Sequence, residues 1–161
     1  MLCSHESLAD LLKQREQYRL MSLDVGSKTI GVAFYRSCVR VAIPHKTLLR
    51  YKQDIDSDIK SVLKLVGQEE IDAVVIGMPV QLNREESESS RLVRAFTQKL
   101  LEYCDGMSLE LPITFYDERF TTSMANQILK EAKMKRKQRN KVDNEVAAAI
   151  ILENFAAKAL L

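Results

Sequence analysis

The 161-residue sequence predicts an α/β fold in which a mixed five-stranded sheet carries helices on both faces. Two observations predict this architecture. Three strand-like segments joined by short turns come first, which indicates an antiparallel meander. Helix-like and strand-like segments then alternate, and alternation indicates parallel strands connected by right-handed crossovers. The chain is long enough for one such domain, and its hydrophobic content of 46% is ordinary for a globular core.

The first segment, residues 1–18, is expected to form an amphipathic helical extension. Its leucines fall on one face, and Ser7 is a candidate N-cap. The extension can either pack on the main domain, residues 19–161, or fray.

The main domain begins with the meander and continues with alternating elements. We predict strands at residues 18–25, 29–35 and 39–44, a helix at 55–68, a strand at 71–76, a helix after the polar loop 81–90, a strand at 111–116, and helices at 121–133 and 143–161 with a basic loop between them. Pro79 follows the run at 71–78 and ends it, because proline cannot extend a strand ladder.

Three acidic residues lie where a backbone element could direct a carboxylate toward one point: Asp24, Glu118 and Asp143. Asp24 ends the first predicted strand and Glu118 follows the last one, and in open sheets ligands bind at the carboxyl ends of the strands. Asp143 is predicted to be the N-cap of the last helix, which is by itself a structural reason for an aspartate. Ala147 and Ala148 could let that helix lie close to the sheet, although helix propensity explains the alanines equally well.

A cluster of three carboxylates would be stable at neutral pH mainly with a bound cation, because like charges raise one another's pKa values. Oxygen ligands suit Mg²⁺ or Mn²⁺. Three scattered cysteines and two histidines, His5 in the extension and His45 in a predicted loop, argue against a zinc site and a Ser-His-Asp arrangement. The three acids are therefore predicted to be the metal ligands and catalytic residues of a hydrolase that cuts a nucleic-acid backbone.

Positive charge is concentrated just before Asp143. Residues 130–141 hold seven basic residues and one acid, a local charge of +6 that leaves −4 for the rest of a chain whose net charge is +2. A basic stretch beside an acidic site is typical of proteins that hold a polyanion, although a solvated charge run gives the same pattern. Arg119 could contact phosphate, or it could form a structural ion pair with Asp117 or another acid. The candidate nucleic-acid contacts are Lys28, Arg119, Lys135, Arg136, Lys137, Arg139 and Lys141.

Four segments resemble the successive motifs of the YqgF/RuvX family. They are residues 23–33 (LDVGSKTIGVA), 76–79 (IGMP), 117–122 (DERFTT), and Asp143 with the alanines and apolar residues of 147–152. The resemblance implies a ribonuclease-H-like fold, a cytoplasmic location, and Asp24, Glu118 and Asp143 as catalytic acids. The loop after Pro79 lacks the glycine usual in the family, which leaves its substrate contacts open, and Phe120 replaces the usual leucine.

The resemblance implies one of two activities, processing of the 5′ end of pre-16S rRNA in ribosome biogenesis or resolution of Holliday junctions in DNA recombination and repair. We favour the first, with pre-rRNA and a ribosomal precursor particle as partners. A non-catalytic RNA-binding assembly factor is the alternative of another class. The Asp24 motif is also similar to the phosphate loop of sugar kinases and actin-like ATPases, but those folds need two such domains.

No segment has the apolar length of a membrane span or of a signal peptide core, so we expect a cytoplasmic protein without a membrane partner. The sequence does not indicate an oligomeric state.

Overall fold

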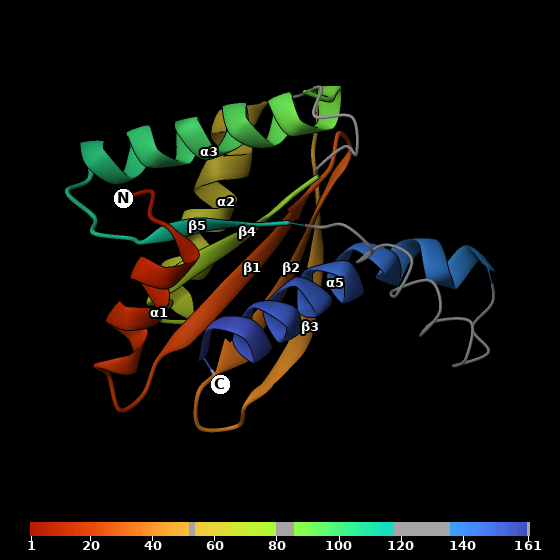
Figure 1. Cartoon of the computed structure of the whole chain (residues 1–161). Coiled ribbons are helices and arrows are strands. Elements are labelled where there is room, and N and C mark those ends of the chain that lie inside the picture. Colours follow the sequence, from red (N-terminus) through yellow and green to blue (C-terminus); the bar gives the residue numbers. More distant parts are fainter. Residues whose placement is uncertain (52–53, 80–85, 118–135, 161) are drawn as a thin grey trace.

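The computed structural model describes residues 1–51, 54–79, 86–117 and 136–160, and for residues 136–143 it describes the backbone alone (Figure 1). The helix predicted at 121–133 lies outside these residues.

A five-stranded mixed sheet forms the centre of the molecule (Figure 1). Its strands are β1 (Arg19–Val25), β2 (Thr29–Arg36), β3 (Val41–Leu49), β4 (Ala73–Met78) and β5 (Ile113–Asp117). Their order is β3-β2-β1-β4-β5, antiparallel from β3 to β1 and parallel from β1 to β5. The predicted meander and parallel crossovers are confirmed, and β1 is the central strand.

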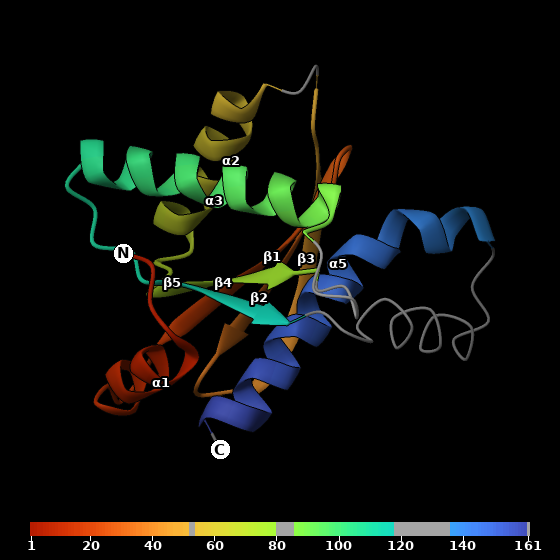
Figure 2. The ribbon, with the colours of Figure 1, turned by 45° about the horizontal axis from the view of Figure 1, so that its top comes forward.

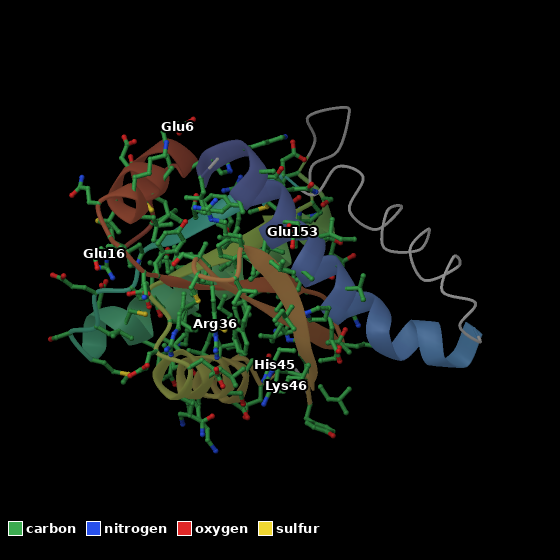
Figure 3. The ribbon with its side chains drawn as sticks, turned by 90° about the horizontal axis from the view of Figure 1, so that it is seen from below. Glu6, Glu16, Arg36, His45, Lys46 and Glu153 are labelled. Carbon is green, nitrogen blue, oxygen red and sulfur yellow. The ribbon has the colours of Figure 1, made fainter. Side chains whose placement is uncertain are left out.

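The edge strand β3 differs from the prediction, because it runs through Pro44 and His45, the second of which we expected in a loop. Proline is tolerated on an edge strand, where its missing N–H removes no ladder bond. A register shift in β2 lies opposite this point. At the same edge, the backbone N–H of Ala42 donates to the Glu153 carboxylate of the helix above at 2.6 Å, and Figure 3 shows Glu153 beside the strand.

Helices cover both faces of the sheet (Figure 2). On one face lie α2 (Ile55–Gln68) and α3 (Glu88–Gly106). On the other lie α1 (His5–Lys13), α5 (Arg136–Phe155) and the π-helical turn η1 (Ala156–Leu160). The bounds of α2 are those predicted. Within the described parts of the chain, none of the helices combines the length and apolarity that a bilayer crossing requires.

The extension packs on the sheet instead of fraying. Leu8 and Leu12 of α1 are fully buried. The preceding backbone adds to the edge of β5, because the N–H of Cys3 donates to the carbonyl of Ile113 at 2.9 Å. The predicted N-cap was wrong: Ser4 caps α1, and its hydroxyl accepts the N–H of Ser7. The division of the chain at residue 18 stays a prediction.

The last helix begins earlier than predicted. α5 starts at Arg136, so Asp143 lies inside the helix and the prediction that it is the N-cap was wrong. Residues 136–142 contain neither glycine nor proline, and the Lys, Arg and Gln among them are strong helix formers. Part of the basic stretch that we expected to be a loop is therefore helical.

Candidate active site

Asp24 lies next to the last residue of the central strand β1 and faces α5. Side chains alternate between the two faces of a strand. Ser22, two residues earlier, donates its hydroxyl to the carbonyl of Ala148 in α5 at 2.5 Å, so Ser22 and Asp24 share the α5 face. This end of β1 is also the carboxyl end of the parallel strands, where ligands bind in open sheets.

Gly31 lets α5 touch the sheet backbone to backbone. Gly31 is the cross-strand partner of Asp24. A Cβ atom at Gly31 would lie 1.9 Å from the carbonyl oxygen of Asn144 and 2.3 Å from its carbonyl carbon, so only glycine fits there. The amide of Asn144 also donates to the Thr29 hydroxyl at 3.0 Å. Because Asn144 follows Asp143 directly, the fold brings Asp143 to within one residue of the strand pair that carries Asp24.

The small residues of α5 let this helix lie close to the sheet. Ala147 and Ala148 are buried. The carbonyl of Ala148 accepts a hydrogen bond from the hydroxyl of Ser22 in β1. Close approach of the helix to the sheet is confirmed.

A buried ion pair holds the turn that follows Asp24. Arg50 Nε donates to Asp58 Oδ2 at 2.7 Å, and both side chains are less than a tenth exposed. Arg50 Nη1 also donates to the carbonyl of Gly26 at 2.7 Å, and the Arg50 N–H donates to the carbonyl of Lys28 at 2.9 Å. The N–H of Gly26 closes the turn on the carbonyl of Thr29 at 2.8 Å. The turn is therefore fixed at both its first and its third residue.

Burial raises the pKa of Asp24 to about 6, from an ordinary value of 3.8. Among the described residues the cause is desolvation, and none of their side chains compensates the charge through a hydrogen bond or an ion pair. A partly buried carboxylate without a described partner is destabilised in its ionised form and gains from a bound cation. The oxygen donor at this position fits Mg²⁺ or Mn²⁺.

The other two predicted ligands are described in part or not at all. Glu118 lies outside the described residues, one residue beyond the end of β5, and of Asp143 the backbone alone is described. Within the described side chains, no group of three potential metal ligands is assembled. The structure therefore places Asp24 and the backbone of Asp143 together, and Glu118 stays a prediction.

Of the predicted nucleic-acid contacts, Lys28 is the one whose side chain is described. It is exposed in the turn after β1, at the same end of the sheet as Asp24. Arg119 and Lys135 lie outside the described residues. Arg136, Lys137, Arg139 and Lys141 lie on the first turns of α5, where the backbone alone is described.

Sequence reasoning missed Arg50, Asp58 and Asn144. Asp58 falls in the first turn of α2, where an acid is expected on local grounds, and Arg50 follows an edge strand, so neither stands out. Asn144 carries no signal except its position after Asp143. The glycine at position 31 was visible within a motif, but its partner in α5 was not.

Comparison with known proteins gives the family. A family model described as "RuvX: Holliday junction resolvase" matches residues 18–158. A protein of Anaplasma marginale named "Putative pre-16S rRNA nuclease" is 36% identical over 135 residues, 84% of this chain and 82% of its own. Proteins of the same name from Rickettsia typhi and Orientia tsutsugamushi are each 37% identical, over 83% and 90% of this chain and 81% and 84% of their own.

Among solved structures, Thermus thermophilus RuvC in complex with a Holliday junction substrate aligns with a TM-score of 0.53. The alignment covers 88% of this chain and 95% of that one at 15% identity, which supports the ribonuclease-H-like fold and nothing finer. The family model and the similar sequences cover most of the chain, and the chain belongs to the RuvX family.

Proposed function

We propose that this protein is a metal-dependent nuclease that hydrolyses phosphodiester bonds at the 5′ end of pre-16S rRNA during ribosome biogenesis. The observation that carries the proposal is Asp24. Its carboxylate is partly buried, without a described partner, at the carboxyl end of the central strand, and α5 packs against the neighbouring strand through Asn144, the residue after Asp143. The names of the similar proteins from Anaplasma marginale and Rickettsia typhi support pre-rRNA as the substrate.

In this proposal Asp24, Glu118 and Asp143 hold Mg²⁺ or Mn²⁺. Bound divalent ions supply a water of lowered pKa and stabilise charge on the leaving oxygen. The chain itself contributes rigidity and substrate contacts. Arg50 and Asp58 fix the turn after Asp24, and the exposed Lys28 on that turn contacts phosphate. The other phosphate contacts are Arg119, Lys135, Arg136, Lys137, Arg139 and Lys141. The activity is placed in the cytoplasm, on a ribosomal precursor particle.

Resolution of Holliday junctions is the second candidate, because the description of the matching family model favours it. Both substrates present the same phosphodiester to the same acids. The two activities differ in the number of sites required, since paired symmetric cuts in a junction need a dimer and trimming of an RNA end does not.

A side-by-side cleavage assay tests the proposal. The purified protein is incubated with a 5′ precursor of 16S rRNA and with a synthetic four-way junction, in Mg²⁺ or Mn²⁺. Asp24→Asn is the inactive variant, and Asp105→Asn, an exposed aspartate at the end of α3, is the matched control.

We expect Asp24-dependent trimming of the RNA, with the control as active as the parent. Symmetric junction cuts without RNA trimming would establish the resolvase instead. RNA binding without cleavage of either substrate would favour the non-catalytic assembly factor, and equal turnover by Asp24→Asn and the parent would remove the proposed metal site.

A further inference from the structure

A cleft of about 430 Å³ lies between α1, the end of β5 and the C-terminal end of α5 with η1. Figure 3 shows Glu6 of α1, one of the lining residues, beside the end of α5. α1 precedes the segment that matches the family model, so one wall of this cleft is built from residues that family membership does not account for. None of the described residues that line the cleft is one of the three acids of the proposed metal site.

The inner surface of the cleft is aromatic. Tyr116 and Phe155 are both buried and meet edge to face, with ring centroids 6.5 Å apart. His5 packs edge to face on Tyr116 at 5.9 Å, and Lys158 Nζ lies 5.6 Å from the centre of the Tyr116 ring. A floor of aromatic groups with a polar margin is typical of sites that take flat, partly polar ligands.

The charged groups of the cleft favour a ligand that donates hydrogen bonds. Among the described lining residues, Glu6 and Asp10 are exposed carboxylates on α1, and Lys13 and Lys158 are exposed ammonium groups. The carboxylates of Glu6 and Asp10 disfavour a free anion such as inorganic phosphate beside α1. Carboxylates accept the N–H groups on the edges of nucleobases, and lysines at the margin can reach the phosphates on either side of such a base.

One lining residue of the cleft, Tyr116, lies near Asp24 on the same face of the sheet. Leu23 pairs with Ile76 and Tyr116 pairs with Gly77, so Asp24 and Tyr116 stand at one level with β4 between them. Two strand spacings separate them by about 10 Å. Tyr116 belongs to the core cluster on the α5 face, which is also the face of Asp24. A strand bound at Asp24 therefore passes the cleft within one or two nucleotides.

We propose that this cleft binds one unpaired nucleobase of the substrate strand next to the phosphodiester that is cut, and that it prefers guanine to uracil. Guanine presents two adjacent N–H donor groups to a carboxylate, whereas uracil presents one. The volume is at the lower end of the range of roughly 300–1,000 Å³ for small-molecule sites, which suits one nucleotide and excludes a duplex. This inference rests on the proposed nuclease function.

The test measures binding without metal, so that it does not depend on cleavage. Fluorescence anisotropy compares single-stranded RNA oligomers that differ in one position, guanine or uracil. Ala159→Trp fills the cleft from η1, where Ala159 is half-buried in its lining. Ala157→Trp is the matched control, because Ala157 is exposed on the same turn and does not line the cleft. A thermal unfolding curve of each variant confirms that it is folded.

We expect the parent and Ala157→Trp to bind the guanine oligomer at least fivefold more tightly, and Ala159→Trp to lose that preference. Asp10→Asn is expected to reduce it, with the exposed Glu16→Gln as its control. Equal binding of both oligomers by the parent, or a preference that survives Ala159→Trp, overturns the proposal.

A competition with guanosine monophosphate identifies the source of the base. Displacement of the oligomer places the base of the RNA strand in the cleft, whereas nucleotide binding without displacement reassigns the cleft to a free nucleotide. Loss of the nuclease function alone would appear as a parent protein that binds with guanine preference and cuts nothing, so the two failures are distinguishable.

Discussion

The two faces of the sheet are packed by different means. Against α2 and α3 the sheet meets large side chains, among them Ile59, Phe96 and Leu100, all fully buried. On the α5 face large side chains such as Ile151 and Phe155 pack as well, but Ser22 and Gly31 of the sheet let the helix backbone itself come into contact. Large side chains keep two layers about 10 Å apart, whereas small residues let backbones approach. The first face carries the larger core cluster, and the second brings the backbone of α5, next to Asp143, into contact with the strand beside Asp24.

The Arg50 and Asp58 pair connects the two faces. Its members belong to the side of α2 and α3, where the Arg50 guanidinium also lies 5.9 Å from the Phe96 ring. The Arg50 Nη1 group donates to the carbonyl of Gly26, in the turn after Asp24. Residues on the face of α2 and α3 thus position the turn after Asp24, a residue that faces α5.

The largest expected effect is that of Gly31→Ala. The added methyl would overlap the backbone of Asn144, so α5 must move away from β2 and carry Asp143 with it. We expect cleavage to fall by at least a hundredfold, and the Mg²⁺-dependent rise in melting temperature to disappear. The cleavage rate and the melting temperature with and without Mg²⁺ are measured for the variant and the parent. Circular dichroism reports whether the variant is folded.

Gly67→Ala is the control for this change. Nothing lies within 4 Å of a Cβ at Gly67, which is in α2, so alanine there should be neutral or stabilise the protein by about 0.5–1 kcal/mol. Full activity of Gly31→Ala would show that close approach of α5 is unnecessary and would end the contrast between the faces.

Arg50→Ala should have the next largest effect. It leaves the buried Asp58 carboxylate without its partner, which costs about 3–5 kcal/mol of unfolding free energy. The double variant Arg50→Met with Asp58→Leu removes both charges and should recover most of that loss in urea unfolding. It should not recover cleavage, because the carbonyl of Gly26 still lacks its donor. Recovery of both properties would limit the pair to a structural role.

Asp24→Asn should stabilise the metal-free protein. With a folded pKa of about 6 and an unfolded value of 3.8, Asp24 binds more protons in the folded state between these pH values. Stability from this group is therefore lost as pH rises from 4 to 6. Asparagine cannot ionise, so the variant should match the parent at pH 4 and exceed it by about 1–3 kcal/mol at pH 8.

Urea unfolding in a chelator at the two pH values measures this difference, with Asp105→Asn as the control. Addition of Mg²⁺ should stabilise the parent and leave Asp24→Asn unchanged. A variant that is less stable than the parent at pH 8 would mean that the carboxylate has a favourable partner, against the desolvation that raises its pKa.

Most of the fold could be predicted from the sequence, because period-two and period-3.6 patterns report which residues are buried. The bounds of α2 and the meander followed directly. The start of α5 did not, since an aspartate at position 143 fits an N-cap as well as a helix interior, and helix propensity through the basic residues decided between them. The residues around position 143 do not by themselves show whether the aspartate is an N-cap or lies inside the helix.

The site was predictable to a smaller extent. Asp24 was found because a strand end and a glycine turn mark it, and the parallel order of β1, β4 and β5 was inferred from alternation. Arg50 was missed because its role depends on a contact with Gly26, which belongs to a different part of the fold. Asn144 was missed because its contact with Thr29 joins residues that are far apart in the sequence. Such contacts follow from tertiary packing, which no periodicity records.

The smallest expected effect is that of an Ile→Val substitution made once on each face of the sheet. Ile59 in α2 and Ile151 in α5 are both fully buried, one on each face. Ile→Val at either position removes one methylene and should cost about 0.5–1.5 kcal/mol of unfolding free energy. If the small-residue face sets the geometry of the site, Ile151→Val should also lower the cleavage rate severalfold, because α5 settles differently on β1 and β2, whereas Ile59→Val should leave the rate of the folded protein unchanged. Equal rates for the two variants at equal stability would mean that both faces position the acids, and the close contact at Gly31 would then be a consequence of packing density alone.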